Sequence, residues 1–67
     1  MAVAKTIEII ASSTESIEQA VKHGLAKASE TLDQIEGVWV KDIKAHVSDG
    51  QLVEWRVIMV LTFVLKD

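Results

Sequence analysis

The C-terminal segment VEWRVIMVLTFVL, residues 53–65, constrains the fold more than any other part of the chain. It is long enough and rich enough in β-branched residues to form a strand, yet both of its faces are apolar. One face would carry Trp55, Val57, Met59, Leu61, Phe63 and Leu65, and the other Ile58, Val60 and Val64 together with Arg56 and Thr62. A strand with one face in water should alternate apolar and polar residues. The segment is therefore predicted to be a strand that is covered on both faces.

The chain has 67 residues, which predicts one small domain over residues 1–67. A core of this size rarely supplies more than about 3–5 kcal/mol, and small domains compensate with disulfides, metals or oligomerisation. There is no cysteine, so disulfides and thiolate metal sites are excluded. Oligomerisation is the remaining remedy, and we expect the second face of the strand to contact another copy of the chain.

Several function classes have little support in the composition. The net charge is −3 with acidic and basic residues interspersed, which argues against a nucleic-acid surface. The late apolar run is interrupted by Glu54 and Arg56 and is shorter than the roughly 20 residues of a membrane helix. The first residues do not resemble a signal peptide, so a cytoplasmic location is expected. There is no nucleophile–base arrangement or glycine-rich phosphate loop, and we predict that the protein is not an enzyme.

The N-terminal half predicts a strand over residues 3–11 and then one amphipathic helix of about 20 residues. Its apolar stripe consists of Ile17, Ala20, Val21, Gly24, Leu25, Ala28, Leu32 and Ile35. Ser12 or Ser13 is predicted to cap this helix, and the sequence does not choose between them. Glu18 and Lys22 form a favourable i, i+4 pair. Gly24 costs about 1 kcal/mol relative to alanine, so we expect it to allow a close approach of the helix to the sheet.

The C-terminal half predicts strands over residues 38–47 and 52–65, joined by a hairpin turn at Asp49 and Gly50. A two-residue loop would pair Val38 with Leu61, Trp39 with Val60, Val40 with Met59, and Ile43 with Arg56; a longer loop would shift these pairs. The order is then β-α-β-β, and a right-handed crossover places the third strand between the first two. The predicted fold class is α+β: a three-stranded antiparallel sheet wrapped on one helix.

The helix is expected to cover one face of this sheet. The covered face would carry Val38, Val40, Val57, Met59, Leu61 and Phe63. The far face would carry Gly37, Trp39, Lys41, Ile43, Arg56, Ile58, Val60 and Thr62. We predict that the far face holds both the self-association surface, with Ile43, Ile58 and Val60 as its contacts, and any ligand site.

The whole chain resembles the dodecin family. The resemblance runs from VAKTIEIIASSTESIEQAVKHGLAKASETL through VKDIKAHVSDGQLVEW to the closing LTFVL, and it depends on the ordered set of segments rather than on one motif. Dodecins assemble as hollow homododecamers, and most bind flavins, such as riboflavin or FMN, in pairs between subunits as stores or buffers. The resemblance implies the same fold, assembly and small-molecule role for this chain.

The same resemblance indicates that the flavin site is altered. The family's stacking tryptophan opens the second strand, at the position of Gly37, and its flavin-binding glutamine lies early in the third strand, at the position of Arg56. An aromatic stack contributes about 0.5–1.5 kcal/mol beyond area burial, and arginine has no hydrogen-bond acceptor. The chain therefore looks more like the dodecin subgroup that lacks the flavin residues, some members of which bind calcium.

Two residues of this region each have two possible roles that the sequence does not distinguish. Trp39 lies on the same face as Gly37, and either stacks on a planar ligand or fills the vacated volume between subunits. Arg56 either forms an ion pair, with Glu36, Asp42 or Glu54 of another subunit, or binds an anionic ligand group.

The sequence offers no metal-ligand motif. His23 and His46 have no partner at metal-ligand spacing and are expected to be solvated. Trp55 is expected to pack in the core. Calcium could be bound only by carboxylates that symmetry gathers from several copies.

Overall fold

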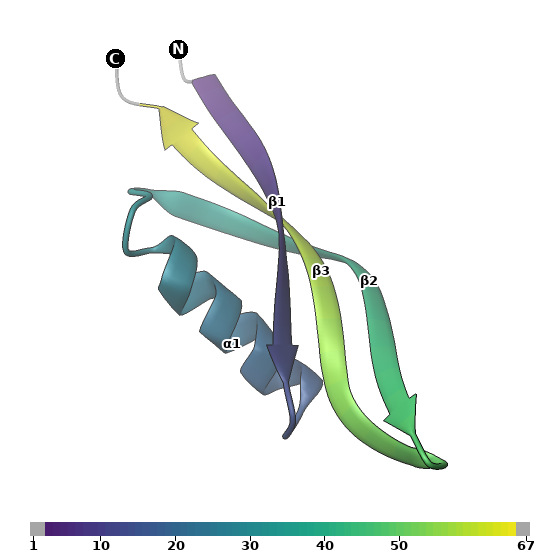
Figure 1. Ribbon diagram of the computed structural model, residues 1–67. Coiled ribbons are helices and arrows are strands. Elements are labelled where there is room, and N and C mark those ends of the chain that lie inside the picture. Colours follow the sequence, from purple (N-terminus) through teal and green to yellow (C-terminus); the bar gives the residue numbers. More distant parts are fainter. Residues whose placement is uncertain (1–2, 66–67) are drawn as a thin grey trace.

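The computed structural model describes residues 3–65. The chain forms strand β1 (Val3–Ser13), helix α1 (Ile17–Ala28), strand β2 (Ile35–Ser48) and strand β3 (Gln51–Leu65). Both β1 and β2 pair antiparallel with β3, which lies between them in the order β1-β3-β2 (Figure 1). The β-α-β-β order, the central third strand and the single covering helix are as predicted.

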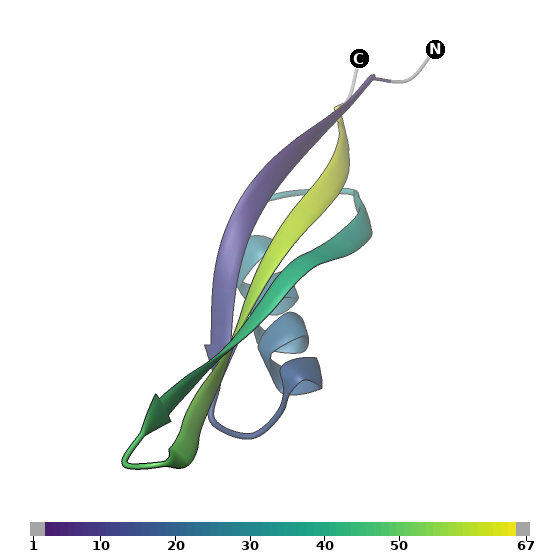
Figure 2. The ribbon, with the colours of Figure 1, turned by 90° about the vertical axis from the view of Figure 1, so that its right-hand side faces the viewer.

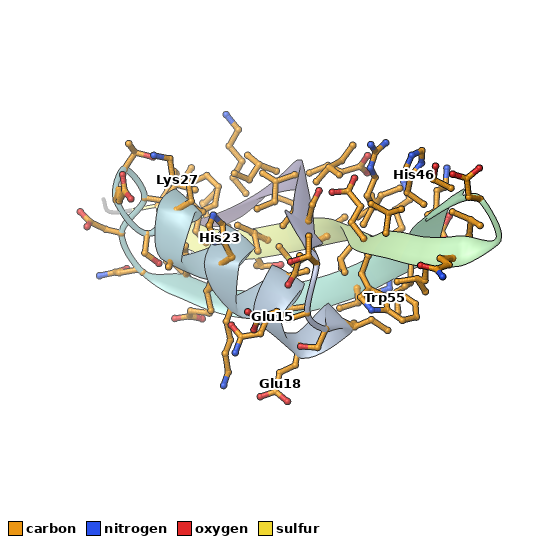
Figure 3. All side chains as sticks on the ribbon, turned by 60° about the horizontal axis from the view of Figure 1, so that its bottom comes forward. Glu15, Glu18, His23, Lys27, His46 and Trp55 are labelled. Atoms are coloured by element: carbon orange, nitrogen blue, oxygen red, sulfur yellow. The ribbon has the colours of Figure 1, made fainter. Side chains whose placement is uncertain are left out.

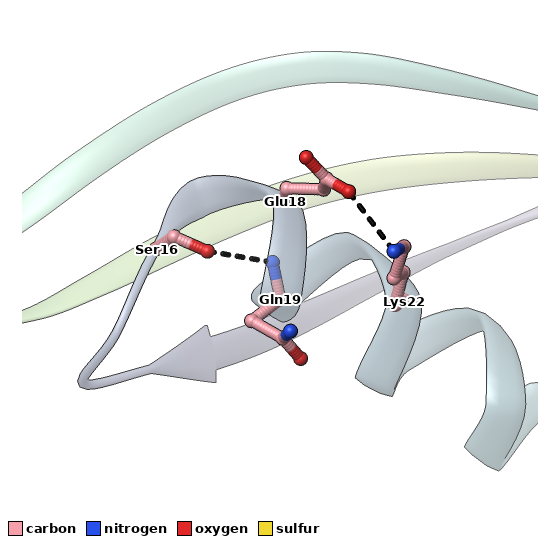
Figure 4. Close-up of polar contacts among 4 residues, drawn as sticks. All are labelled: Ser16, Glu18, Gln19 and Lys22. Carbon is pink, nitrogen blue, oxygen red and sulfur yellow. Dashed lines mark hydrogen bonds and ion pairs between the residues drawn. The ribbon is translucent and has the colours of Figure 1, made fainter.

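Helix α1 begins later than expected. Ser16 is the N-cap: its backbone is extended, and its Oγ accepts a hydrogen bond from the Gln19 N–H at 3.0 Å (Figure 4). The prediction of a cap at Ser12 or Ser13 is wrong, because both residues belong to β1. The Ser13 hydroxyl instead accepts from the Glu15 N–H at 3.0 Å, in the turn between strand and helix. The segment Ser-Ile-Glu-Gln at 16–19 has capping-box spacing and was the signal to follow.

The helix is also shorter than the predicted 20 residues. It ends at Ala28; a turn follows over residues 29–31, and an irregular segment leads to β2. The Thr31 hydroxyl donates to the Ala28 carbonyl at 3.5 Å, a local bond of the kind that competes with helix continuation. Gln34 adopts φ +55°, and Ile35 then pairs with Phe63 as the first residue of β2. Ile35 therefore belongs to the sheet, and its assignment to the helix from the helical spacing is wrong.

The core lies between α1 and the two strands beneath it. Its fully buried side chains are Ala20 of α1 and Val57, Met59 and Leu61 of β3. A Cβ placed on Gly24 would lie 2.5 Å from Met59 Cε and 2.9 Å from Ala11 Cβ. The predicted close approach at Gly24 is confirmed.

The hairpin turn confirms the two-residue loop. Asp49 and Gly50 have φ of +52° and +73°, the left-handed pair that a type I′ turn requires. The pairs of Val38, Trp39 and Val40 with Leu61, Val60 and Met59 are as predicted.

Ile43 is the exception to the predicted register. Lys41 forms a bulge, an extra unpaired residue of β2 between Val40 and Asp42, which displaces the pairs of residues 42–46 by one position. A second irregularity, at Val53 of β3, returns Val47 and Ser48 to the pairing expected from the two-residue loop. Ile43 therefore pairs with Val57, and Lys44 takes the place opposite Arg56. Because Val57 is buried beneath α1, Ile43 lies on the helix side of the sheet, and its assignment to the far face is wrong.

Helix α1 covers only part of the sheet. It packs on β1 and β3, and Figure 2 shows the β2–β3 hairpin projecting past both α1 and the end of β1. A helix of 12 residues is about 18 Å long, whereas a strand of 15 residues is about 50 Å long. The Cα atoms accordingly span 52 × 19 × 13 Å. In residues 3–65 no helix has the length and apolarity needed to cross a bilayer.

Candidate functional site

The far face of the sheet, the side opposite α1, carries an apolar surface around the middle of β3. Its members in register are Thr6, Glu8 and Ile10 of β1, Ile58, Val60, Thr62 and Val64 of β3, and Gly37 and Trp39 of β2. Ile58 and Val60 are half-buried, whereas Ile10 is 65% exposed and Trp39 is 61% exposed. Within residues 3–65 no element covers this face, since α1 lies on the other side.

Ile10 was missed as a member of this face. The sequence showed Ile7, Ile9 and Ile10 close together, and the alternation of the first strand looked imperfect. The register resolves it: Ile7 and Ile9 pair with Leu61 and Met59 on the helix side, and Ile10 pairs with Ile58 on the far face. Ile10 breaks the alternation set by Ile7 and Ile9, and this break was the feature of the sequence that could have placed it on the far face.

Gly37 lies on the same face as Trp39 and could carry a small side chain without a clash. A Cβ added at Gly37 would meet only Thr62, at 3.8 Å from its Cβ and 3.9 Å from its Oγ1. The Trp39 ring therefore does not fill this volume within the protomer. An exposed indole on the same face as a residue without a side chain is an arrangement that a planar molecule, or a side chain of another subunit, would complete.

Arg56 lies far from this pair. It is on the same face, but six residues along β3 from Thr62, the partner of Gly37, and six residues span about 20 Å. The fold brings Gly37 and Trp39 together and leaves Arg56 apart within one protomer. A site that used all three residues would have to be built from more than one chain.

The ion pair of Arg56 is intramolecular. Its Nε donates to Glu54 Oε1 at 2.9 Å, and the two side chains project from the same strand two residues apart. Glu54 was among the predicted partners, and within one chain it is the residue that Arg56 contacts. Arg56 also faces Lys44 on β2, so two cations lie side by side at the start of the hairpin.

A second ion pair crosses the centre of the far face. Lys41 Nζ lies 3.0 Å from Glu8 Oε1, so the pair links β2 to β1 over β3. Both side chains are about half exposed, and such pairs contribute about 0–1 kcal/mol. The pair places a polar band beside Trp39 and Val60, which narrows the apolar surface available to a ligand.

The helix side contains a separate groove along the free edge of β1. It has a volume of about 780 Å³, an apolar floor that includes Ile7, Ile9 and Leu32, and His23 and Lys27 at its rim. Lys27 is 3.5 Å from Glu30, and Figure 3 shows His23 and Lys27 on α1. His23 and His46 are both exposed, as predicted. The described chain contains no group of three or more histidine, cysteine or acidic side chains that could hold a metal ion.

One carboxyl group has a clearly perturbed pKa. The hydrogen bond from Lys22 to Glu18, at 2.9 Å, and the charge of the ammonium group lower the pKa of the Glu18 carboxyl (Figure 4). Both side chains are well exposed and lie on the outer surface of α1. This confirms the predicted i, i+4 pair, and it is a local helix contact remote from Trp39.

The fold and these surfaces define a class of small α+β subunit, in which a twisted three-stranded sheet wraps one short helix and leaves its far face uncovered. Comparison with known proteins identifies the class. A family model described as Dodecin matches residues 3–66. The chain belongs to the dodecin family.

Relatives of known structure agree with this assignment. A curated dodecin from Thermus thermophilus is 29% identical over 63 residues, which are 94% of this chain and 91% of the relative. Dodecin from Streptomyces coelicolor superposes with a TM-score of 0.94 at 27% identity, covering 98% of this chain and 94% of that chain. The calcium dodecin of Mycobacterium tuberculosis, a calcium-chelating antigen with a calcium-binding site, superposes with a TM-score of 0.84 at 26% identity. The match covers 96% of this chain and 91% of that chain.

Proposed function

We propose that this dodecin is a shell-forming homo-oligomer, a hollow homododecamer, of a flavin-storage family, and that its own flavin site is altered so that it does not hold flavin tightly. The supporting observation is the far face: Ile10 and Trp39 are exposed beside half-buried Ile58 and Val60. The described residues 3–65 contain one helix, which lies on the other side of the sheet, and no second element that could cover that surface.

The identities of Gly37 and Arg56 support the loss of tight flavin binding. At Gly37, where the family has its stacking tryptophan, no aromatic plane is available. At Arg56, a charged guanidinium that already binds Glu54 replaces a neutral amide. The role we propose is structural or storage-related, without catalysis, and in the cytoplasm.

The oligomer is tested by the mass of the purified protein. A dodecamer of 7.4-kDa chains has a mass of about 89 kDa, twelve times that of the chain, which sedimentation equilibrium resolves from smaller species. Val60→Asp places an unpaired carboxylate on the far face and should lower the mass, because burying it in a contact is costly. Gln19→Asp, on the exposed face of α1, is the matched control. A wild-type monomer would refute the assembly.

The flavin prediction is tested by titrating the assembled protein with riboflavin or FMN. We expect no quenching of flavin fluorescence at micromolar concentration. Quenching at that concentration, or a yellow protein after purification, would overturn the altered-site proposal.

A second candidate function is the binding of a flavin or another planar molecule through Trp39. The observation that favours it is the 61% exposed indole of Trp39, on the same face as Gly37, which has no side chain. If this function is correct, binding quenches both the fluorescence of the flavin and the fluorescence of the protein's tryptophan. Trp39→Ala should abolish the quenching of flavin while the oligomer mass stays unchanged.

Calcium binding is a third candidate, motivated by the calcium-chelating relative from M. tuberculosis. Since no cluster of three ligating side chains exists in residues 3–65 of one protomer, the carboxylates would have to come from several copies. Titration calorimetry with calcium chloride on the assembled protein, and on a variant that does not assemble, tests this: heat released only by the assembly supports it.

A further inference from the structure

The turn that closes the hairpin, at Asp49 and Gly50, is also the one Asp-Gly sequence of the chain, which has no asparagine. An aspartyl carboxyl group can condense with the backbone nitrogen of the next residue, because Cγ, Cβ, Cα, the main-chain carbonyl carbon and that nitrogen close a five-membered ring. The side chain of the next residue normally crowds this nitrogen, and glycine has none. Of the aspartates in residues 3–65, at positions 33, 42 and 49, only Asp49 precedes a glycine.

The Asp49–Gly50 turn is open to solvent. Both residues are exposed, and a Cβ added to Gly50 would meet no atom within 4 Å. Within residues 3–65 no hydrogen bond or ion pair holds the Asp49 carboxylate. The carboxyl group is therefore free to rotate, and water reaches the peptide bond that follows it.

The turn is also weakly restrained. β1 ends at Ser13, which pairs with Trp55, so only β2 and β3 reach the tip of the hairpin (Figures 1 and 2). A two-stranded hairpin is marginally stable by itself, and local opening costs least at such an end. Asp49 has φ +52°, a left-handed conformation that costs free energy in a residue with a side chain. Opening of the turn releases this strain and lets the carboxyl group approach the Gly50 nitrogen.

We propose that Asp49 is a site of spontaneous isoaspartate formation. In the first step the Gly50 nitrogen attacks Cγ of the protonated Asp49 carboxyl group. The N–Cγ bond forms, and the carboxyl hydroxyl leaves with the amide hydrogen as water, which gives a succinimide.

In the second step a water molecule adds to the succinimide. Addition at Cγ breaks the new N–Cγ bond and restores aspartate. Addition at the main-chain carbonyl carbon breaks the original C–N bond, so that Gly50 remains joined to the side-chain carbonyl group as isoaspartate. Solvent water is the only other reactant, and the two steps together are an isomerisation without net loss of atoms.

Asp42 provides the internal comparison. Its Oδ1 accepts a hydrogen bond from the Ile43 N–H at 2.9 Å, so this carboxylate already lies beside the next backbone nitrogen. Ile43 is β-branched and crowds that nitrogen, however, and strand pairing with Ile58 and Val57 holds the backbone of both residues. A carboxylate near an amide is therefore not sufficient, and the difference between the two positions is the glycine and the open turn.

Isoaspartate would change the hairpin locally. The main chain then passes through Cβ and gains one atom, which a two-residue type I′ turn does not accommodate. We expect the pair nearest the turn, Ser48 with Gln51, to open, and the amides of these two residues to exchange hydrogen faster. The buried residues of β3 begin at Val57 and should keep their pairs.

Prolonged warm incubation of the full chain in mildly acidic buffer tests the proposal. A protease that cleaves before aspartate but not before isoaspartate then reports each position separately. We expect about tenfold more isoaspartate at position 49 than at position 33 or 42, because glycine leaves the attacking nitrogen uncrowded whereas a β-branched neighbour does not. Mass spectrometry should detect the succinimide as a species lighter by one water.

Two variants assign the reaction to Asp49. Asp49→Gly removes the carboxyl group and keeps a Gly-Gly pair that suits the turn, so it should abolish the methyl transfer catalysed by an isoaspartate-specific methyltransferase. Asp42→Glu is the matched control and should leave that methyl transfer at the wild-type level.

Three results would overturn the proposal. The first is equal isoaspartate at positions 33, 42 and 49. The second is methyl transfer that survives Asp49→Gly. The third is a folded protein without isoaspartate at position 49 under conditions in which the chain unfolded in urea accumulates it, because the native turn would then protect the peptide bond. None of these readouts depends on oligomer mass, so their failure leaves the proposed shell standing, and a monomeric protein leaves this test unaffected.

Discussion

Gly24→Ala adds one methyl group where α1 lies closest to the sheet. The new Cβ would lie 2.5 Å from Met59 Cε, 2.9 Å from Ala11 Cβ and 3.4 Å from Ile9 Cδ1. The Met59 methyl is the end of a flexible side chain and can move. The Ala11 Cβ is fixed to the backbone of β1, so relief there requires the helix and the strand to separate.

Two effects of opposite sign set the magnitude. Alanine is favoured over glycine in a helix by about 1 kcal/mol. Overpacking of a filled core costs about 1–3 kcal/mol, and the contact with Ala11 cannot be relieved by a side-chain rotation. We therefore expect Gly24→Ala to destabilise the protein by about 1 kcal/mol, although helix propensity alone predicts a gain.

Thermal unfolding followed by circular dichroism, at one protein concentration, measures this change. For a domain of this size, 1 kcal/mol corresponds to a decrease in Tm of about 4–8 °C. Ala26→Gly, on the exposed side of α1, calibrates the propensity effect without any packing change. A Tm for Gly24→Ala equal to or above that of the wild type would show that the helix has room at this position and that the close-approach argument is mistaken.

Two further predictions concern the ends and surface of α1. Ser16→Ala removes the oxygen that accepts from Gln19 and should cost about 0.5–2 kcal/mol, whereas Ser12→Ala should change the thermal stability little; comparable losses in both melts would contradict Ser16 as the cap. The folded pKa of Glu18 is lowered below its ordinary value of 4.5, so its stabilising contribution is present above that value and is lost as the pH falls through the lowered folded pKa. Lys22→Gln should raise the Glu18 pKa towards 4.5 in an NMR titration of the carboxyl carbon, and an unchanged pKa would refute the pairing.

The candidate site was predictable in part. The far face could be located from Ile58 and Val60, because a strand with two apolar faces has to be covered twice. Gly37 and Trp39 are two residues apart in one strand, so their places on the same face could be predicted. The distance of Arg56 from them within one chain depends on the register between β2 and β3, and the pairs of Val38 and Trp39 that the two-residue loop predicted agree with it.

The bulge at Lys41 is the feature that sequence patterns concealed. It moves Ile43 from its expected place on the far face to the helix side, and a second register shift at Val53 does the same for Leu52. Only a full set of pairs shows that Ala45, Val47 and Leu52 share that side. One unpaired residue exchanges the two faces for the residues that follow it in the same strand, and the residue types around Lys41 do not indicate it.

The sequence by itself determined the order of the elements, the Asp49–Gly50 turn, the central apolar strand and the close approach at Gly24. Each depends on local periodicity or on a backbone requirement that neighbouring residues specify. The tertiary structure decided where α1 starts and stops, which side Ile43 faces, and how much of the sheet remains uncovered. These depend on competition between helix and sheet for the same residues, as at Ile35, and that competition is settled by pairing with residues distant in the chain.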